Sequence, residues 1–145
     1  MSADGKADMP STGPRRDMNE ITAFARHLGV IRIAATAGRS EVALDLSDTR
    51  RNYKGEAHGG LIAALMDIAM ARAVRSADAD VWGLSTISMT VNFLAPGRGA
   101  LVARGQMVRG GATIAVAEAE VDGEDGGQVA RASAIFRIIR DGPTH

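Results

Sequence analysis

The sequence predicts an α+β domain in which an antiparallel sheet packs against one long buried helix. Residues 61–71 are apolar on almost every face, and a helix of that kind belongs in the interior of a protein. Around this stretch, segments of alternating apolar and polar residues are separated by glycine-rich turns, which is typical of antiparallel strands. The expected order is a short helix, two strands, the long helix and four more strands, giving a sheet of about six strands with one face to cover.

The short helix is expected from Asp17 to Leu28. Asp17 is placed to cap its start, and Gly29 is placed to close its end. Apolar residues recur there at spacings of three and four, which indicates an amphipathic helix. These apolar positions are Met18, Ile21, Phe24, Ala25 and Leu28.

Six segments have the pattern of strands. In the strand after the long helix, one face is expected to carry Ile87, Met89, Val91 and Phe93, and the other Thr86, Ser88, Thr90 and Asn92. Two later strands carry alanine at every second position, at residues 115–119 and 130–134, so that a helix could approach the sheet closely there. A turn at residues 38–40 joins the first two strands, and a polar loop over residues 48–57 leads to the long helix. The predicted strands are Val30–Thr36, Glu41–Leu46, Val81–Leu94, Leu101–Val108, Ala112–Val121 and Gln128–Arg140.

Length and composition limit the classes of protein that fit. A chain of 145 residues suits one domain, expected at residues 17–140 between a disordered N-terminal tail, 1–16, and a C-terminal tail, 141–145. Seventeen basic and seventeen acidic side chains balance, which disfavours binding to nucleic acid or an anionic membrane. There is no cysteine, no secretory signal and no apolar run long enough to span a bilayer. We expect a cytoplasmic protein without metal or cofactor.

A polar, glycine-rich stretch from Asn52 to Gly60 leads into the long helix. Five residues separate Asn52 from the triplet His58-Gly59-Gly60, and Asp67 follows Gly60 by seven residues. This combination of spacings resembles the signature of hotdog-fold acyl-CoA thioesterases of the phenylacetate-pathway type, the PaaI-like family. The resemblance covers roughly residues 28–139. It implies the hotdog fold, in which an antiparallel sheet wraps around a central helix.

The resemblance also implies an activity, hydrolysis of an acyl-CoA thioester. In the family, the helix aspartate is the general base or the nucleophile, and the asparagine and a glycine N–H polarise the thioester carbonyl. A Ser or Thr on the next strand helps to hold the water. The corresponding catalytic residues here are Asp67, Asn52, Gly59, Thr86 and, in a secondary role, His58. Residues expected to contact the substrate are Gly60, Ser85, which is also a substitute for Thr86, Met66 and Met70.

Elementary physics supports these roles independently of the resemblance. Gly59 and Gly60 open the helix, so their N–H groups lack partners within it and form a cradle for a developing oxyanion. Desolvation in an apolar helix should raise the pKa of Asp67 and make it a useful base. Eight residues separate Gly59 from Asp67, about 12 Å along a helix axis, so one chain cannot bring both to one carbonyl. We expect two antiparallel central helices, in a homodimer that is the minimal active unit and assembles further into a dimer of dimers.

Other interpretations stay open. His58 could simply cap the helix, Asp67 could pair with an arginine across a dimer interface, and Met66 and Met70 could be core residues. A non-catalytic module that binds or senses acyl-CoA is the main alternative function, although pure binding gives no benefit for a buried base. A hotdog hydratase ranks third, and a serine hydrolase is disfavoured because no Gly-x-Ser-x-Gly is present. The sequence does not define the acyl group.

Overall fold

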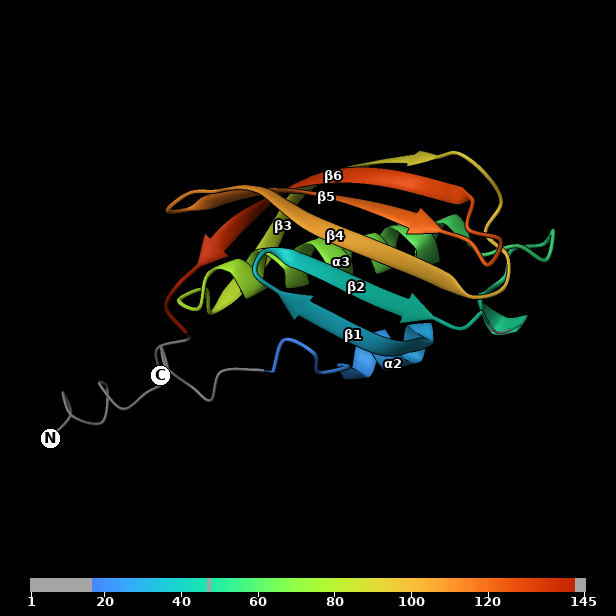
Figure 1. Ribbon diagram of the computed structural model, residues 1–145, viewed down its shortest axis with the longest axis horizontal. Helices are drawn as coiled ribbons and strands as arrows, with labels where there is room; N and C mark the ends of the chain where they lie inside the picture. Colours follow the sequence, from blue (N-terminus) through green and yellow to red (C-terminus); the bar gives the residue numbers. More distant parts are fainter. Residues whose placement is uncertain (1–16, 47, 143–145) are drawn as a thin grey trace, which may run out of the picture.

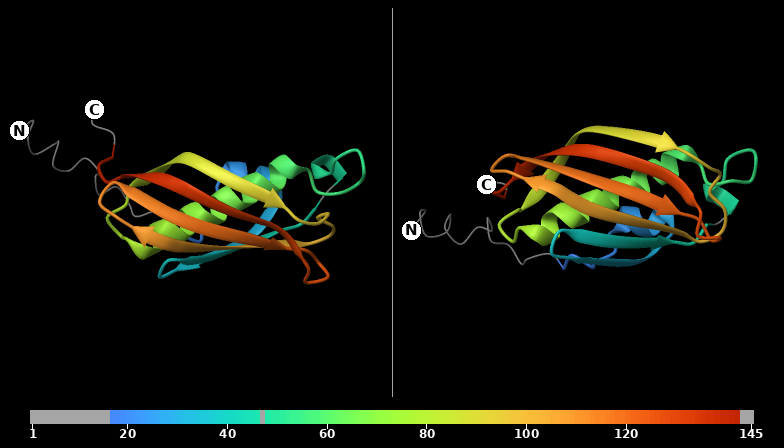
Figure 2. Two further views of the ribbon diagram at one scale, coloured as in Figure 1. Left: turned by 90° about the horizontal axis from the view of Figure 1, so that it is seen from above. Right: turned by 45° about the horizontal axis from the view of Figure 1, so that its top comes forward.

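A six-stranded antiparallel sheet curves around one long helix in the computed structural model, which describes residues 17–46 and 48–142. Figures 1 and 2 show the central helix α3 lying in the hollow of the sheet, with the short helix α2 beside strand β1. The predicted fold class is confirmed. The tail predicted at residues 1–16 lies outside the described residues, as do residues 143–145. Within the described part of the chain, no helix is both long and apolar enough to cross a membrane.

The sheet has the strand order β1-β2-β4-β5-β6-β3, so β1 and β3 form its two edges. The chain after α3 therefore crosses to the far edge before β4 returns to pair with β2. The elements are α2 (Ala23–Leu28), β1 (Val30–Thr36), β2 (Arg39–Leu44), the 3-10 turn η1 (Asp48–Arg50), α3 (Gly59–Ala77), β3 (Gly83–Phe93), β4 (Leu101–Gly110), β5 (Ile114–Asp122) and β6 (Gln128–Ile139).

Helix α2 is shorter than predicted because its cap is Thr22 and not Asp17. The Thr22 hydroxyl accepts a hydrogen bond from the Ala25 N–H at 3.4 Å. Asp17 instead holds a local turn by accepting from the Asn19 N–H. The predicted C-terminal end is correct, since Gly29 closes the helix in the left-handed conformation, with φ 98°.

The first hairpin turns earlier than predicted. Its turn residues are Ala37 and Gly38, with φ of 50° and 85°, and two successive positive φ angles match the twist of a two-residue hairpin. Strand β2 therefore begins at Arg39 and ends at Leu44, two residues before each predicted boundary. A residue other than glycine at positive φ is uncommon, so the sequence had favoured a turn around Gly38-Arg39-Ser40.

The core is formed where α3 lies on the small residues of the sheet. The predicted alanine rows of β5 and β6 are all buried. The closest approach is at Gly105 of β4, where an added Cβ would lie 2.4 Å from the carbonyl oxygen of Ala69. The same oxygen accepts a hydrogen bond from the buried Ser40 hydroxyl at 2.5 Å. Small side chains thus let a helix backbone contact the sheet directly.

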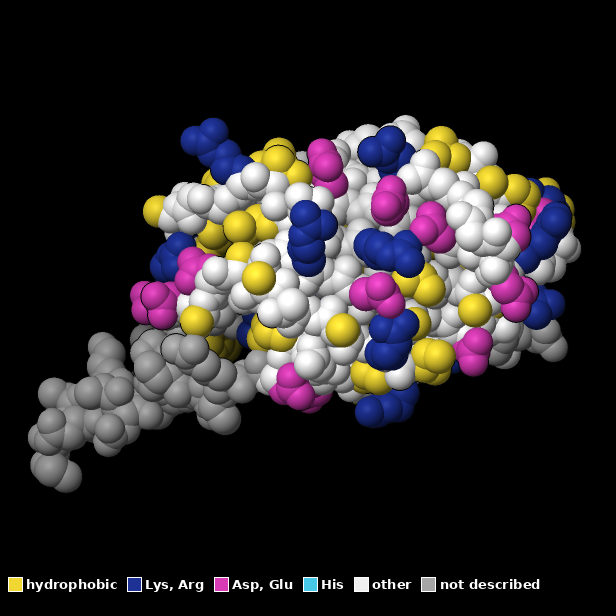
Figure 3. Space-filling view, in the orientation of Figure 1, with side chains coloured by type: hydrophobic (Ala, Val, Ile, Leu, Met, Phe, Trp, Pro, Cys, Tyr) yellow, Lys and Arg dark blue, Asp and Glu magenta, His cyan; other side chains and the backbone are white. Residues whose placement is uncertain are grey.

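The opposite face of the sheet carries charges of alternating sign. Along one cross-strand row, Glu41 of β2, Arg104 of β4, Glu120 of β5 and Arg131 of β6 lie in register. Arg104 also donates to Asp122 at 2.6 Å. Figure 3 shows basic and acidic side chains interspersed over this face. Opposite charges on neighbouring strands favour this register.

A second ionic contact fixes the far end of α3. Arg140 donates to the Asp78 carboxylate at 2.9 Å and to the carbonyl oxygens of Gly111 and Ala112. A hydrogen bond from the Asp80 N–H and then the Arg140 guanidinium hold the pKa of Asp78 below its ordinary value. The end of β6, the β4–β5 turn and the helix terminus are thereby joined.

The close approach of α3 predicts a strong effect of Gly105→Ala. The added methyl group would overlap the Ala69 carbonyl, so we expect the free energy of unfolding to fall by about 2 kcal/mol. The matched control is Gly83→Ala, because no atom lies within 4 Å of a Cβ built there. Denaturant unfolding of both variants provides the measurement. Equal stabilities would mean that the helix does not rest on Gly105.

Candidate active site

His58 caps the start of α3. Its side-chain Nδ1 accepts a hydrogen bond from the Gly60 N–H at 2.9 Å, and its backbone N–H donates to the Arg50 carbonyl at 3.1 Å. The capping role considered for His58 is therefore present, and in the neutral ring its proton lies on Nε2. The Gly60 N–H is engaged by this cap, so it is not the free donor expected from the sequence.

The Gly59 N–H keeps its hydrogen-bonding capacity. It belongs to the first helical residue, so it has no acceptor within α3, and no acceptor faces it among the described residues. On the other side, a Cβ at Gly59 would lie 3.5 Å from the Phe93 ring. The Gly59 N–H, which the sequence predicts to be an oxyanion donor, therefore lies at the positive end of a 19-residue helix, beside an aromatic side chain.

Asn52 organises the loop before α3. Its Oδ1 accepts hydrogen bonds from the N–H groups of Lys54 at 2.9 Å and Glu56 at 3.2 Å. Since the side-chain oxygen is used within the loop, the amide NH₂ remains as a donor. Asn52 and Gly59 line the same cavity, of about 330 Å³. This arrangement brings together the two groups predicted to polarise a carbonyl.

Asp67 lies on the half-covered side of α3, next to the edge strand β3 of the sheet. Its side chain is half-buried in the single chain and not fully buried as expected from the sequence. It is also not isolated, because the Thr86 hydroxyl of β3 donates to its Oδ1 at 2.8 Å. The surrounding helix face is only half-covered and consists of Ala63, Ala64, Ile68 and Ala71. The expectation that α3 is buried on every side is wrong for one chain.

A β-bulge in β3 turns Thr86 toward α3. Thr86 pairs with Phe136 and Ser88 with Ile135, which leaves Ile87 as the extra residue. The predicted alternation holds after the bulge, where Met89 faces the helix side, but it is shifted before it, so that Thr86 also faces the helix side while Ile87 is exposed. Ser85, the proposed substitute, is exposed and alternates to the opposite face of the strand.

The predicted site residues form two separate groups in one chain. Asn52 and Gly59 line the first cavity, whereas Asp67, further along α3, and Thr86 of β3 line neither this cavity nor the next two. A second cavity, of about 410 Å³, lies beside His58 and Gly60, and a third, of about 650 Å³, lies on the polar outer face of the sheet. Met66 and Met70 are fully buried in the core and contribute to none of them.

Two aromatic side chains were not predicted at the site. Phe93 lines the cavity of Asn52 and Gly59, and Phe24 of α2 lines the cavity of His58. Their exposed fractions are 55% and 60%. Both had been placed on apolar faces by periodicity, which does not distinguish a core residue from a residue on the wall of a cavity.

Comparison with protein families identifies the class of this chain. Residues 54–130 match the model described as the thioesterase superfamily, and the match starts within the Asn52 loop and includes α3 and β3. The candidate esterase VNG_1336C of Halobacterium salinarum is 34% identical, over 79% of this chain and 83% of that protein. The chain therefore belongs to the thioesterase superfamily.

Solved structures place it more closely. PaaI of Escherichia coli, from the phenylacetic acid degradation operon, is 25% identical with a TM-score of 0.71, covering 85% of this chain and 87% of that one. BH2602 of Bacillus halodurans, solved with CoA, is 30% identical with a TM-score of 0.67, covering 72% and 70%. The PaaI-like hotdog prediction is confirmed.

The contacts of Asn52 predict that two substitutions will differ. Asn52→Ala removes the acceptor for two loop N–H groups, so we expect amide exchange at Lys54 and Glu56 to accelerate by about tenfold, as the loss of a net hydrogen bond implies. Asn52→Asp keeps an acceptor oxygen and should leave exchange near the wild-type rate, although it removes the NH₂ donor. Hydrogen exchange followed by NMR distinguishes them. Equal acceleration in both variants would contradict this account of the loop.

Proposed function

We propose that this protein hydrolyses acyl-CoA thioesters to a free acid and CoA. The observation that carries the proposal is the Asp67–Thr86 hydrogen bond on an otherwise apolar helix face, because an oriented carboxylate there can act on a bound ligand. Two further observations support it, namely the available Gly59 N–H next to the Asn52 amide and a structural neighbour that was solved with CoA. Both polarising donors and an attacking group are thus available from side chains and backbone alone.

In the proposed reaction, the thioester oxygen accepts hydrogen bonds from the Gly59 N–H and the Asn52 NH₂. These donors stabilise the negative charge that develops on the oxygen as the carbonyl carbon becomes tetrahedral. Asp67 either takes a proton from a water that attacks this carbon, or attacks it directly to form an anhydride that water then hydrolyses. The C–S bond breaks, CoA leaves as a thiolate that takes up a proton, and the acid is released.

The Thr86 hydroxyl gives the carboxylate a defined orientation. Since this hydroxyl donates to Asp67 Oδ1, its lone pairs remain available to accept a hydrogen bond from the attacking water. A water held by both side chains would lie on the half-covered face of α3. Thr86 is thus proposed to position the nucleophile, as the family resemblance implied.

The catalytic groups are proposed to come from two chains. Gly59 and Asp67 are about 12 Å apart along the same helix, so these two groups of one chain cannot both contact the same thioester carbonyl. The half-covered face of α3 and the open edge of β3, with Ile87 and Phe93 more than half exposed, provide surfaces that a second copy could cover. A two-fold axis would place Asp67 of one protomer opposite Gly59 of its partner. Further pairing into a dimer of dimers stays a prediction.

A non-catalytic acyl-CoA-binding module is the second candidate. Its support is that the polarising donors and the cavities would bind a thioester equally well without reaction. The Asp67–Thr86 pair favours the enzyme, because a carboxylate facing the ligand adds nothing to the binding of an anionic CoA ester.

Thiol release from a panel of short, long and aromatic acyl-CoA substrates tests this proposal. We expect release from the wild-type protein without added metal, and we expect Asp67→Asn to lower kcat by about 10²- to 10⁴-fold, with KM little changed, since the amide keeps the size but accepts no proton. No release from any substrate would favour the binding module. A parallel collapse of affinity in Asp67→Asn would assign this residue a structural role.

Hybrid dimers test the composite site. Asp67→Asn and Asn52→Asp homodimers should each be nearly inactive, but a hybrid has one site with both changes and one with neither. With one working site of two, isolated hybrids should recover about half of the wild-type activity, whereas a mixture in which random reassortment makes half of the dimers hybrids should recover about a quarter. Co-expression with two tags and isolation of the doubly tagged species provides the sample. If isolated hybrids are as inactive as their parents, the two residues do not act across an interface.

A further inference from the structure

The backbone of Glu56 holds Asn52 from both sides. The Asn52 N–H donates to the Glu56 carbonyl at 2.6 Å, and the Glu56 N–H donates to the Asn52 Oδ1 at 3.2 Å. Gly55, with φ 78°, makes the turn between them, and its N–H donates to the Asn52 carbonyl at 3.0 Å. Since the side-chain oxygen is held in this way, the direction of the Asn52 NH₂ follows the position of Glu56.

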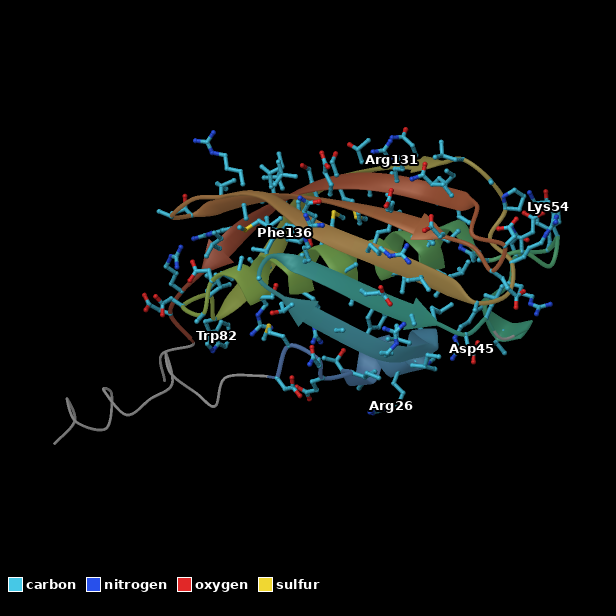
Figure 4. All side chains as sticks on the ribbon, viewed as in Figure 1. Arg26, Asp45, Lys54, Trp82, Arg131 and Phe136 are labelled. Carbon is cyan, nitrogen blue, oxygen red and sulfur yellow. The ribbon has the colours of Figure 1, made fainter. Side chains whose placement is uncertain are left out.

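The side chain of Glu56 is only 14% exposed and lies between two cations. The Lys54 Nζ is 3.5 Å from its Oε2, and the Arg98 guanidinium is 3.5 Å from its Oε1. Lys54 belongs to the same loop, which projects at one end of the molecule in Figure 4. Arg98 belongs to the connection between β3 and β4. A carboxylate with so little exposure is costly without partners, and here one partner comes from another part of the chain.

The connection between β3 and β4, residues 94–100, is itself fixed. The N–H groups of its first two residues both donate to the Val129 carbonyl of β6, at 2.8 and 3.1 Å. Its Gly97 carbonyl accepts a hydrogen bond from the Ala57 N–H at 2.8 Å, and a Cβ built at Gly97 would lie 3.1 Å from that of Ala57. Arg98 therefore extends from a backbone that is tied to the sheet.

The cavity of Asn52 is lined from both segments. Asn52, Glu56 and Gly59 line it from the loop and the start of α3, and residues 93–97 line it from the end of β3 and the connection. A shift between the two segments would move the Asn52 amide relative to the Gly59 N–H. Stabilisation of a developing charge depends on donors that are already in place, so such a shift would weaken it. The ion pair of Glu56 with Arg98 crosses between these segments.

We infer that Glu56 is a positioning residue, which holds the Asn52 amide in place by joining its loop to the β3–β4 connection through Arg98. The inference rests on the proposed function, since it concerns how one donor to the thioester oxygen is kept in position. Glu56 does not itself act on the thioester in this role. Its negative charge would oppose the charge that develops on the thioester oxygen, and the two cations offset it.

Steady-state kinetics with a saturating acyl-CoA substrate test this role. Full loss of an oxyanion donor lowers kcat by about 10²- to 10³-fold. Glu56→Ala leaves Asn52 present but less fixed, so kcat should fall by about tenfold, with KM changed by less than about twofold. Arg98→Ala should cause a similar fall in kcat. The double variant should lose no more than about tenfold, because both changes break the same contact.

Lys54→Ala is the matched control. It also removes one positive charge at 3.5 Å from Glu56, but from within the same loop, and it keeps the backbone N–H that bonds Asn52. We therefore expect kcat to fall by less than about twofold. Arg32→Ala breaks an exposed ion pair with Glu41 between β1 and β2, and it should leave kcat unchanged. Circular dichroism of each variant verifies that the fold is intact.

Amide exchange at residue 54 gives a measurement that is independent of turnover. This N–H donates to the Asn52 Oδ1, so its protection factor reports how firmly the Asn52 side chain is held. The protection factor should fall by about threefold in Glu56→Ala and in Arg98→Ala, since the bond is weakened and not removed. It should keep its wild-type value in Arg32→Ala.

The outcomes separate this inference from the proposed function. If the wild-type protein releases no thiol but protection falls in both variants, hydrolysis is contradicted and the positioning of Asn52 by Glu56 is supported. If the wild-type protein is active but the two losses multiply in the double variant, or Lys54→Ala loses as much as Arg98→Ala, the inference is overturned and hydrolysis stands. Unchanged protection at residue 54 in Glu56→Ala also overturns it, because any fall in kcat would then come from a direct action of Glu56 on the substrate.

Discussion

The contact of the Ala69 carbonyl with Gly105 and Ser40 sets the distance between α3 and the sheet, and the site depends on that distance. A helix held further away would separate Asp67 from the β3 hydroxyl that orients it. The same helix carries Gly59 at its start, so one packing contact in the middle of α3 controls the positions of both ends of the site. The absence of a side chain at Gly105 of β4 is therefore as important for the chemistry as the hydroxyl of Thr86 on β3.

Patterning was sufficient to predict most of the fold. The six strands and the long helix follow from alternation and from a continuous apolar run, because both express burial directly. The errors occur where a local choice depends on backbone conformation. Ala37 takes a positive φ that composition does not indicate, and the α2 cap is one of several residues able to fill that role. Such choices are decided by tertiary contacts rather than by the residues themselves.

The sequence indicated which residues are candidates for the site, but not how they are arranged in space. The spacing from Asn52 to Asp67 singled out both groups as candidates, and their catalytic roles stay predictions. The side of β3 that carries Thr86 was misjudged, since a bulge adds one residue without any signal in the sequence. Phe24 and Phe93 were missed for a different reason. An aromatic residue in a periodic pattern has the same appearance whether it fills a core or lines a cavity, and only the arrangement of neighbouring elements distinguishes the two cases.

The open edge of β3 links the behaviour of this protein to its concentration. A long unpaired strand is a template for pairing with other chains, and natural proteins protect such edges. On the proposed assembly, the protecting partner is also the source of half of each site. Mass action then makes both protection and specific activity fall together on dilution, so that turnover per chain varies with the amount of protein present. A newly synthesised chain at low concentration would therefore keep an unpaired β3 edge, open to pairing with other proteins, until it dimerises.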